Sequence, residues 1–285
     1  AGGAALGGGA LVEAAARGDA VEVIAHRGAA NARPENTLAA FEHAIEVGAD
    51  WIELDVQETA DGERVIVHDR DFMKLAGNPL QVHAATLAQI REIDVGAHFG
   101  PEWAGERVPT LGEVLDLARD RIKVLIELKH YGFAVRLEER VAEVVSARGM
   151  DDQVAVMTSE RDSLARLRAL EPSWRLGLLA ASSVGDLTRE PVDFLAVRAG
   201  AVTDGLLTRA RRAGMPVLVW TVNDPLTMSA MISRGASGLI TSEPALARRV
   251  LTERAEMGAA ERLLLAAADL FDLPAPHRPA RDDSP

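Results

Sequence analysis

The sequence contains no cysteine. Disulfide bonds and metal sites built from thiolates are therefore excluded, and a bound metal ion would need oxygen or nitrogen ligands. The absence of cysteine leaves the cellular compartment open.

Positive charge is outnumbered, with 31 lysines and arginines against 43 aspartates and glutamates. The 285 residues carry a formal net charge of -12, with a pI of about 5.1. A nucleic-acid partner is not expected, because binding to phosphate backbones requires a basic face. A soluble acidic surface accounts for the charge. The 48% of hydrophobic residues suffices for a sizeable core, either in one domain of barrel size or in two small ones.

No apolar run reaches the roughly 18–20 residues that cross a bilayer. The chain begins at Ala1, and its first twelve residues are small, apolar and rich in glycine. We expect residues 1–20 to be a linker or the tail of a membrane segment that lies outside this sequence. Membrane attachment through such a segment is therefore one expectation, and the sequence gives no signal for an oligomeric state.

Glycine-rich loops of the dinucleotide-binding or P-loop type are missing after every apolar run. Short β-branched runs instead alternate with amphipathic stretches, which is typical of βα units on a parallel sheet. The expected strands are residues 21–25, 50–57, 122–129, 153–158, 174–179, 193–197, 216–222 and 237–241, and the clearest helices are 37–47, 133–147, 159–170, 204–213 and 225–233. Eight such strands favour a closed (β/α)₈ TIM barrel over residues 21–250.

One connection departs from this pattern. Ala60-Asp61-Gly62 predicts a tight turn into a hairpin strand at residues 64–68. Residues 69–109 then form an insertion after the second strand, and segments of that length usually serve a function or cover a site. We expect a C-terminal helix at residues 251–273 and a disordered tail at residues 274–285.

Three carboxylates are expected to enter one end of the barrel. Side chains alternate along a strand, so Glu53 and Asp55 share a face, and Glu127 shares one with Lys129 on a neighbouring strand. Buried together, the carboxylates would repel unless a cation compensates them. Mg²⁺ or Ca²⁺ suits such oxygen ligands. The alternative is that the three acids belong to unrelated salt bridges.

Two histidines follow strands at the same expected end. His26 ends the first strand and His68 ends the hairpin strand, so the pair could supply a general base and a general acid. Arg27 could hold phosphate oxygens with two hydrogen bonds. The other histidines are interpreted as structural or surface residues, with His130 the least certain because it follows Lys129: His43, His83, His98, His130 and His277.

Lysine is rare in this chain. Only Lys74, Lys123 and Lys129 occur among 31 basic residues. A lysine beside Glu127 therefore suggests that a compact ammonium is needed there, and a phosphate oxygen is a natural partner. The alternative is that Lys129 only neutralises the nearby acids.

The combined motifs resemble the glycerophosphodiester phosphodiesterase family over about residues 21–249. The matching segments are His26-Arg27-Gly28, Pro34-Glu35-Asn36-Thr37, Glu53-Leu54-Asp55, Val67-His68-Asp69, Ile126-Glu127-Leu128-Lys129, Val219-Trp220-Thr221-Val222-Asn223 and Gly238-Leu239-Ile240-Thr241-Ser242-Glu243-Pro244. The resemblance implies a TIM barrel with a small insertion after the second strand.

The resemblance also implies site roles and a reaction. Glu53, Asp55 and Glu127 would bind the metal, His26 and His68 would be the acid/base pair, and Arg27 and Lys129 would contact phosphate. Trp220 would line the substrate pocket beside the alcohol, and Glu35, with Asn36, would brace the first loop or touch the substrate. The implied reaction is hydrolysis of a glycerophosphodiester to sn-glycerol 3-phosphate and an alcohol.

Two alternatives remain, a phospholipase resembling sphingomyelinase D that acts on choline lipids, and a non-catalytic barrel that binds a polyol phosphate.

The segment Asp71-Phe72-Met73-Lys74-Leu75-Ala76-Gly77 looks like the subgroup whose catalytic domain follows a multi-span membrane region, as do the apolar start and the segment at residues 260–265. Membership of that subgroup would place a lipid headgroup among the possible substrates.

Overall fold

The computed structural model describes residues 21–133, 136–183 and 185–258. Eight parallel strands of this part close into a barrel, in which β1 pairs with both β11 and β2. The strands are β1 (Glu22–Ala25), β2 (Trp51–Glu58), β6 (Lys123–Leu128), β7 (Val154–Thr158), β8 (Arg175–Ala180), β9 (Phe194–Arg198), β10 (Val217–Trp220) and β11 (Gly238–Thr241). The predicted (β/α)₈ barrel is confirmed, and each predicted strand overlaps an observed one.

The two faces of the strands carry different side chains. Ile52 and Leu54 on β2 and Ile126 on β6 belong to the large core between the strands and the helices. The barrel interior holds a separate apolar cluster that includes Ile24, Trp51, Leu125, Ala155, Met157, Phe194, Ala196, Leu218 and Ile240. Alternation along β2 therefore turns Glu53 and Asp55 inward, as predicted, because Ile52 and Leu54 are held by the outer core.

Helices follow the strands on the outside of the barrel. Their bounds are α2 (Leu38–Glu46), α5 (Leu111–Ala118), α6 (Leu137–Ser146), α7 (Arg161–Leu170), α8 (Asp204–Ala213), α9 (Pro225–Arg234) and α10 (Pro244–Glu256). Short 3₁₀ turns, η4 (Leu187–Arg189) and η5 (Ala199–Ala201), flank β9. The hydroxyls of Thr37 and Thr110 accept hydrogen bonds from backbone N–H groups in the first turns of α2 and α5, which satisfies donors that a helix leaves free.

Some predicted bounds need correction. Helix α6 begins at Leu137 rather than at residue 133, and the expected domain limit at residue 250 falls inside α10. The buried guanidinium of Arg254 donates hydrogen bonds to the hydroxyls of Ser229 and Ser233 on α9, so α10 is packed as part of the barrel to its last turn. The expectations for residues 1–20 and for most of 251–285 lie outside the described residues.

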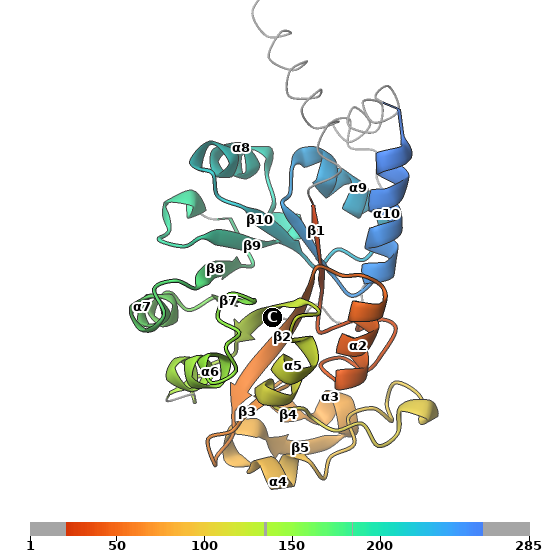
Figure 1. The fold of residues 1–285 in the computed structure, drawn as a ribbon, viewed down its shortest axis with the longest axis vertical. Helices are drawn as coiled ribbons and strands as arrows, with labels where there is room; N and C mark the ends of the chain where they lie inside the picture. The colour runs from red at the N-terminus through yellow and green to blue at the C-terminus, as the bar shows by residue number, and fades with distance from the viewer. Residues whose placement is uncertain (1–20, 134–135, 184, 259–285) are drawn as a thin grey trace, which may run out of the picture.

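The hairpin after β2 is also confirmed. Strand β3 (Arg64–Ile66) pairs antiparallel with β2 and ends two residues before His68. The insertion that follows has structure of its own: β4 (Asp71–Phe72), α3 (Met73–Ala76), β5 (Asn78–Gln81), η2 (Val82–Ala84), α4 (Leu87–Ile90) and η3 (Pro101–Trp103). It forms a second apolar core around Phe72, Val82 and Ile90, and lies at one end of the molecule beyond β3 (Figure 1).

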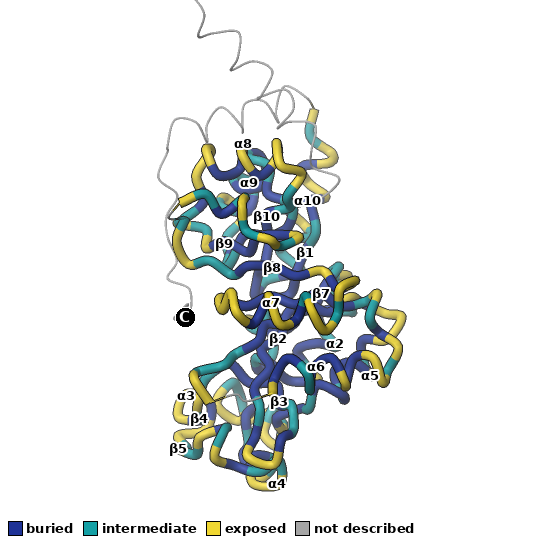
Figure 2. The backbone as a smooth tube through the Cα atoms, turned by 90° about the vertical axis from the view of Figure 1, so that its left-hand side faces the viewer, coloured by how far each residue is buried: buried dark blue, intermediate teal, exposed yellow. Residues whose placement is uncertain are grey.

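Burial follows this layered plan. The barrel strands are mostly buried, whereas exposed backbone gathers on outer helix turns and on the insertion (Figure 2). No helix in the described part of the chain is both long and apolar enough to cross a membrane.

Candidate active site

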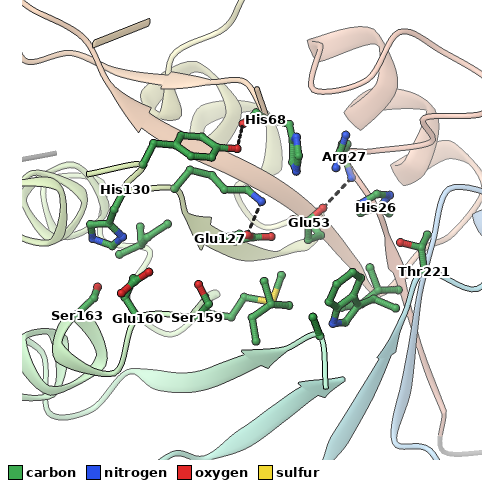
Figure 3. A pocket seen from close by; sticks show the side chains of 18 of the residues that line it. His26, Arg27, Glu53, His68, Glu127, His130, Ser159, Glu160, Ser163 and Thr221 are labelled. Atoms are coloured by element: carbon green, nitrogen blue, oxygen red, sulfur yellow. Dashed lines mark hydrogen bonds and ion pairs between the residues drawn. The ribbon is translucent and has the colours of Figure 1, made fainter. Parts of the chain in front are cut away.

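A cavity of about 560 Å³ opens at the carboxyl ends of the barrel strands. This is the end at which TIM-barrel enzymes place their active sites. Figure 3 shows two groups of side chains along it, with His26, Arg27, Glu53, His68 and Glu127 on one side and His130, Ser159, Glu160 and Ser163 on the other. We call these the phosphate end and the outer end. The phosphate end gathers the residues that the sequence predicts as one site.

The loop after β1 is shaped to present Arg27. Arg27 has a positive φ of 51°, and Gly28 follows with a φ of 80°. A Cβ atom on Gly28 would lie 2.7 Å from the carbonyl carbon of Ala40, so the loop packs against α2 only with glycine there. The backbone N–H of Arg27 donates a hydrogen bond of 2.9 Å to Glu53 Oε2, which fixes the loop to β2.

The three predicted metal ligands converge. Glu53, Asp55 and Glu127 each offer a carboxylate oxygen within 4.8 Å of the other two. Asp55 Oδ2 accepts a hydrogen bond from Asn36 Nδ2 at 2.9 Å and lies 3.3 Å from Arg27 Nε. Glu53 Oε1 and Asp55 Oδ1 are buried and accept no hydrogen bond from the described residues. Glu53 Oε1 is therefore available as a ligand, and Asp55 Oδ1 has only the ion pair with Lys129 Nζ at 3.4 Å.

The negative charge of the three carboxylates is only partly neutralised by the neighbouring cations. Burial, with the neighbouring charges of Asp55 and Glu127, raises the pKa of Glu53 well above its usual value, and burial also raises the pKa of Glu127. The pKa of Asp55 is lowered, because Lys129, His68 and Arg27 together outweigh the effect of burial. The resident cations therefore stabilise only part of the negative charge.

Lys129 and Arg27 lie beside the carboxylates and line the cavity together with Glu53 and Glu127. Lys129 Nζ is 2.5 Å from Glu127 Oε1 and 3.4 Å from Asp55 Oδ1, and the side chain also lines the cavity. These ion pairs keep its pKa above the usual value despite burial. Lys129 thus neutralises acids and faces the cavity at once, so the two interpretations of this residue are compatible.

His26 lies on the other side of Glu53 from Glu127 (Figure 3). Its Nδ1 lies 3.1 Å from Ser242 Oγ, and its backbone N–H donates to the carbonyl of Thr241 at 2.8 Å. Burial, with the charge of Arg27, lowers its pKa well below 6.5. His26 is therefore a neutral imidazole near neutral pH, and Nε2 is the ring nitrogen left for a substrate.

His68 is fixed by more partners than the sequence suggested. Its Nδ1 lies 2.7 Å from Asp69 Oδ1, and its carbonyl accepts a hydrogen bond from the Tyr131 hydroxyl at 2.7 Å. Gln57 Nε2 donates to the carbonyls of Val67, His68 and Asp69 at 2.8, 3.1 and 2.7 Å. No sequence pattern indicated Gln57 or Tyr131, although Gln57 continues the inward alternation of Glu53 and Asp55.

The remaining predicted residues take two different positions. Trp220 lines the cavity, and its indole N–H donates to the carbonyl of Ala196 at 3.1 Å. Glu35 bridges Arg27 Nη1 at 3.0 Å and Lys74 Nζ at 3.1 Å and is not among the cavity-lining residues. Glu35 and Asn36 thus brace the first loop, and Lys74 connects that loop to the insertion.

The outer end contains His130, which the sequence indicated as a structural or surface residue. His130 lines the cavity, and its Nε2 lies 3.1 Å from Glu138 Oε1 on α6. The same oxygen accepts a hydrogen bond of 3.1 Å from Arg166 Nε on α7. Ser159 and Glu160, which follow β7, complete this side (Figure 3). Their position after a barrel strand was the available signal, because such loops form the mouth.

The fold and this site define a class of protein. It is a TIM-barrel enzyme whose mouth combines two cations for an anionic substrate with an acidic cluster and two histidines. Residues 26–246 match the family described as the glycerophosphoryl diester phosphodiesterase family.

Proteins similar to this chain support the same family. The chain is 34% identical to a glycerophosphodiester phosphodiesterase of Caldanaerobacter subterraneus subsp. tengcongensis, with 78% of this chain and 94% of the relative covered. It is 30% identical to one of Bacillus subtilis, with 84% and 91% covered. A solved phosphodiesterase of Oleispira antarctica, in complex with the product sn-glycerol-3-phosphate, superposes with a TM-score of 0.77 at 25% identity, covering 81% of this chain and 96% of that one. This chain belongs to the glycerophosphoryl diester phosphodiesterase family and is a phosphodiesterase of glycerophosphodiesters.

Proposed function

We propose that this enzyme is a metal-dependent phosphodiesterase that uses His26 and His68 as its acid/base pair and releases sn-glycerol 3-phosphate and an alcohol. The observation that carries the proposal is the convergence of both histidines, two cations and three carboxylates at one end of a single cavity. The product complex of the Oleispira antarctica relative supports the same product here.

The acidic cluster fits a divalent cation. Three carboxylates (Glu53, Asp55 and Glu127) lie against the two cations Arg27 and Lys129, and the two buried oxygens without hydrogen bonds belong to this group. Hard oxygen donors suit Mg²⁺ or Ca²⁺. Glu53, Asp55 and Glu127 would hold the ion, which when bound would stabilise negative charge on the phosphodiester oxygens.

The chain's own residues supply the remaining chemistry. Arg27 and Lys129 bind the phosphodiester oxygens and stabilise charge that develops during attack. His26 Nε2 accepts a proton of the attacking water as the new P–O bond forms. Where the substrate's own glycerol hydroxyl attacks instead, His26 takes that proton, a cyclic phosphate forms, and water opens it in a second step to give sn-glycerol 3-phosphate. The bond from phosphorus to the alcohol oxygen breaks, and protonated His68 donates its Nε2 proton to the leaving oxygen. Asp69, hydrogen-bonded to Nδ1, orients the His68 ring and stabilises its protonated form.

The direct test is product analysis on glycerophosphocholine by phosphorus NMR, with and without EDTA. The proposal predicts sn-glycerol 3-phosphate with metal present and loss of activity after chelation, with recovery on adding Mg²⁺ or Ca²⁺. A persistent cyclic phosphate product would favour the sphingomyelinase D-like alternative. Activity indifferent to EDTA would contradict the metal site.

We also propose that the enzyme works near a membrane. The support is the sequence alone: small apolar residues precede the barrel, and residues 71–77 resemble the membrane-attached subgroup. Fractionation of source cells, with an antibody against the barrel, tests this. Enzyme found only in the wash after cell lysis at low salt would contradict it.

A further inference from the structure

The insertion reaches the phosphate end of the cavity through a lysine. Lys74 lies on α3, and its Nζ is 3.1 Å from Glu35 Oε2. The other oxygen of that carboxylate, Oε1, is 3.0 Å from Nη1 of Arg27. Glu35 therefore bridges a cation of the insertion and a cation of the active site. Neither Glu35 nor Lys74 lines the cavity, whereas Arg27 does, so the ammonium of Lys74 is one residue removed from the substrate.

The turn that carries Lys74 is fixed by the insertion itself. Leu75 is 5% exposed and belongs to the insertion's own apolar core. Before α3, the carboxylate of Asp71 accepts a hydrogen bond from the backbone N–H of Met73 at 3.0 Å. After it, Gly77 ends the helix with a φ of 61°. The position of the ammonium thus follows from the packing of the insertion.

The insertion also holds the loop between β1 and α2 at a second place. The guanidinium of Arg33 lies over the ring of Trp103 on η3, 4.7 Å from its centroid, which is a cation–π contact. Within the loop, the backbone N–H of Asn36 donates to the carbonyl of Arg27 at 3.0 Å. The two ends of the loop are therefore joined, and the segment that carries Glu35 is tied to the insertion on either side of Pro34.

Glu35 fixes the direction of the Arg27 side chain. A guanidinium is planar and its donors form a rigid fork. Nε lies 3.3 Å from Asp55 Oδ2, and Nη1 donates to Glu35. Nη2 makes no hydrogen bond within the described residues, so it is the nitrogen that these contacts leave for a phosphate oxygen. The charge of Glu35 would weaken the attraction of Arg27 for an anion, and the ammonium of Lys74 offsets that charge.

We propose that Lys74 is a positioning residue through which the insertion sets the phosphate-binding guanidinium of Arg27, with Glu35 as the link. The inference rests on the role of Arg27 in the proposed function. Without Lys74, Glu35 keeps only its contact with Arg27 and its charge is no longer offset. The diester phosphate then binds more weakly, while the groups that transfer protons are unchanged.

The test measures kcat and KM on glycerophosphoglycerol, whose alcohol portion is uncharged. Lys74→Met should raise KM about two- to fivefold, as expected for a partly exposed ion pair, and leave kcat within about twofold of the parent. Lys74→Arg keeps the cation and should restore KM. Glu35→Ala should raise KM at least as much as Lys74→Met. Adding Lys74→Met to Glu35→Ala should have no further effect, because Lys74 acts through Glu35.

Lys123→Met is the matched control, since Lys123 is an exposed lysine at the start of β6 and does not line the cavity. Its KM should equal the parent's. An unchanged KM in Lys74→Met would overturn the proposal and leave the proposed function standing, and so would a lowered KM in Glu35→Ala.

A loss that persists in full when Lys74→Met is added to Glu35→Ala would also overturn the proposal. Lys74 would then act on Asp69, whose pKa is lowered mainly by its hydrogen bond with His68 and in smaller part by the charge of Lys74. Failure of the parent enzyme to release sn-glycerol 3-phosphate would contradict the proposed function itself.

Discussion

The two ends of the cavity are built differently. At the phosphate end, Arg27, Glu53 and Asp55 are 6%, 1% and 1% exposed and are linked by hydrogen bonds and ion pairs. At the outer end, Ser159, Glu160 and Asp162 are exposed, whereas Ser163 is buried and His130 is tied to the buried Glu138.

The difference separates chemistry from recognition. Groups that stabilise a transition state act best when they are already in place, since reorganisation during reaction then costs little. A surface that selects among headgroups needs less order, because modest charge complementarity in water gives only modest discrimination. Changes at the phosphate end should therefore affect the rate on every substrate, whereas changes at the outer end should affect the choice among substrates.

The largest effect is expected from the histidines. His26→Ala and His68→Ala should each lower kcat about 10²–10⁴-fold on all glycerophosphodiesters, because each removes a proton-transfer group. Steady-state kinetics on two headgroups measures this. His43→Ala, on the outer helix α2, is the control and should leave kcat unchanged. Activity of either cavity variant close to the parent's would remove that histidine from the mechanism.

A smaller loss is expected from a residue that acts through His68. Gln57→Leu removes the amide that holds three consecutive carbonyls around His68, and should lower kcat roughly 10- to 100-fold with little change in KM. Gln81→Leu, at an exposed position on β5, is the matched control. If Gln57→Leu lowers thermal stability but not kcat, the amide is only structural.

The pH profile tests the state of His26. Burial and Arg27 lower its pKa below 6.5, so it stays neutral until the pH falls through that lowered value. With saturating metal, the acid limb of the kcat/KM profile should therefore lie below pH 6.5. An acid limb centred above pH 6.5 that disappears in His26→Gln would show that His26 is instead charged at neutral pH.

The smallest effect concerns the contact between the insertion and the mouth. His83 stacks on Phe133 with ring centroids 3.7 Å apart, which joins the insertion to the loop that carries Tyr131. His83→Ala should lower the free energy of unfolding by about 0.5–1.5 kcal/mol, measured in urea, with little effect on headgroup ratios. A double-mutant cycle with Phe133→Ala isolates the pair, and a coupling energy near zero would contradict the contact.

Much of the phosphate end could be predicted because it depends on strand alternation. Glu53, Asp55 and Glu127 follow a period of two, and His26 and His68 follow strands, so their convergence required only a closed barrel. Gln57 obeys the same period, but its function depends on backbone carbonyls beyond β3, which no side-chain pattern reveals.

The outer end and the insertion were harder to predict. His130 acquires its orientation from Glu138 and Arg166 on two different helices, and that contact depends on how α6 and α7 pack. The insertion was expected as a long segment that serves a function or covers a site, and no helix or strand was predicted inside it. Its small core of Phe72, Val82 and Ile90 comes from short elements whose periodicity is too brief to detect.

Metal titration of chelated protein tests the central claim most directly. Mg²⁺ or Ca²⁺ is added to EDTA-treated enzyme while heat of binding and release of sn-glycerol 3-phosphate from glycerophosphoethanolamine are followed in parallel. The account predicts one bound ion per chain, recovery of activity at the same ion concentration as binding, and weaker binding in Glu53→Gln. Full activity in the chelated protein, or recovery without any dependence on Glu53, would contradict it.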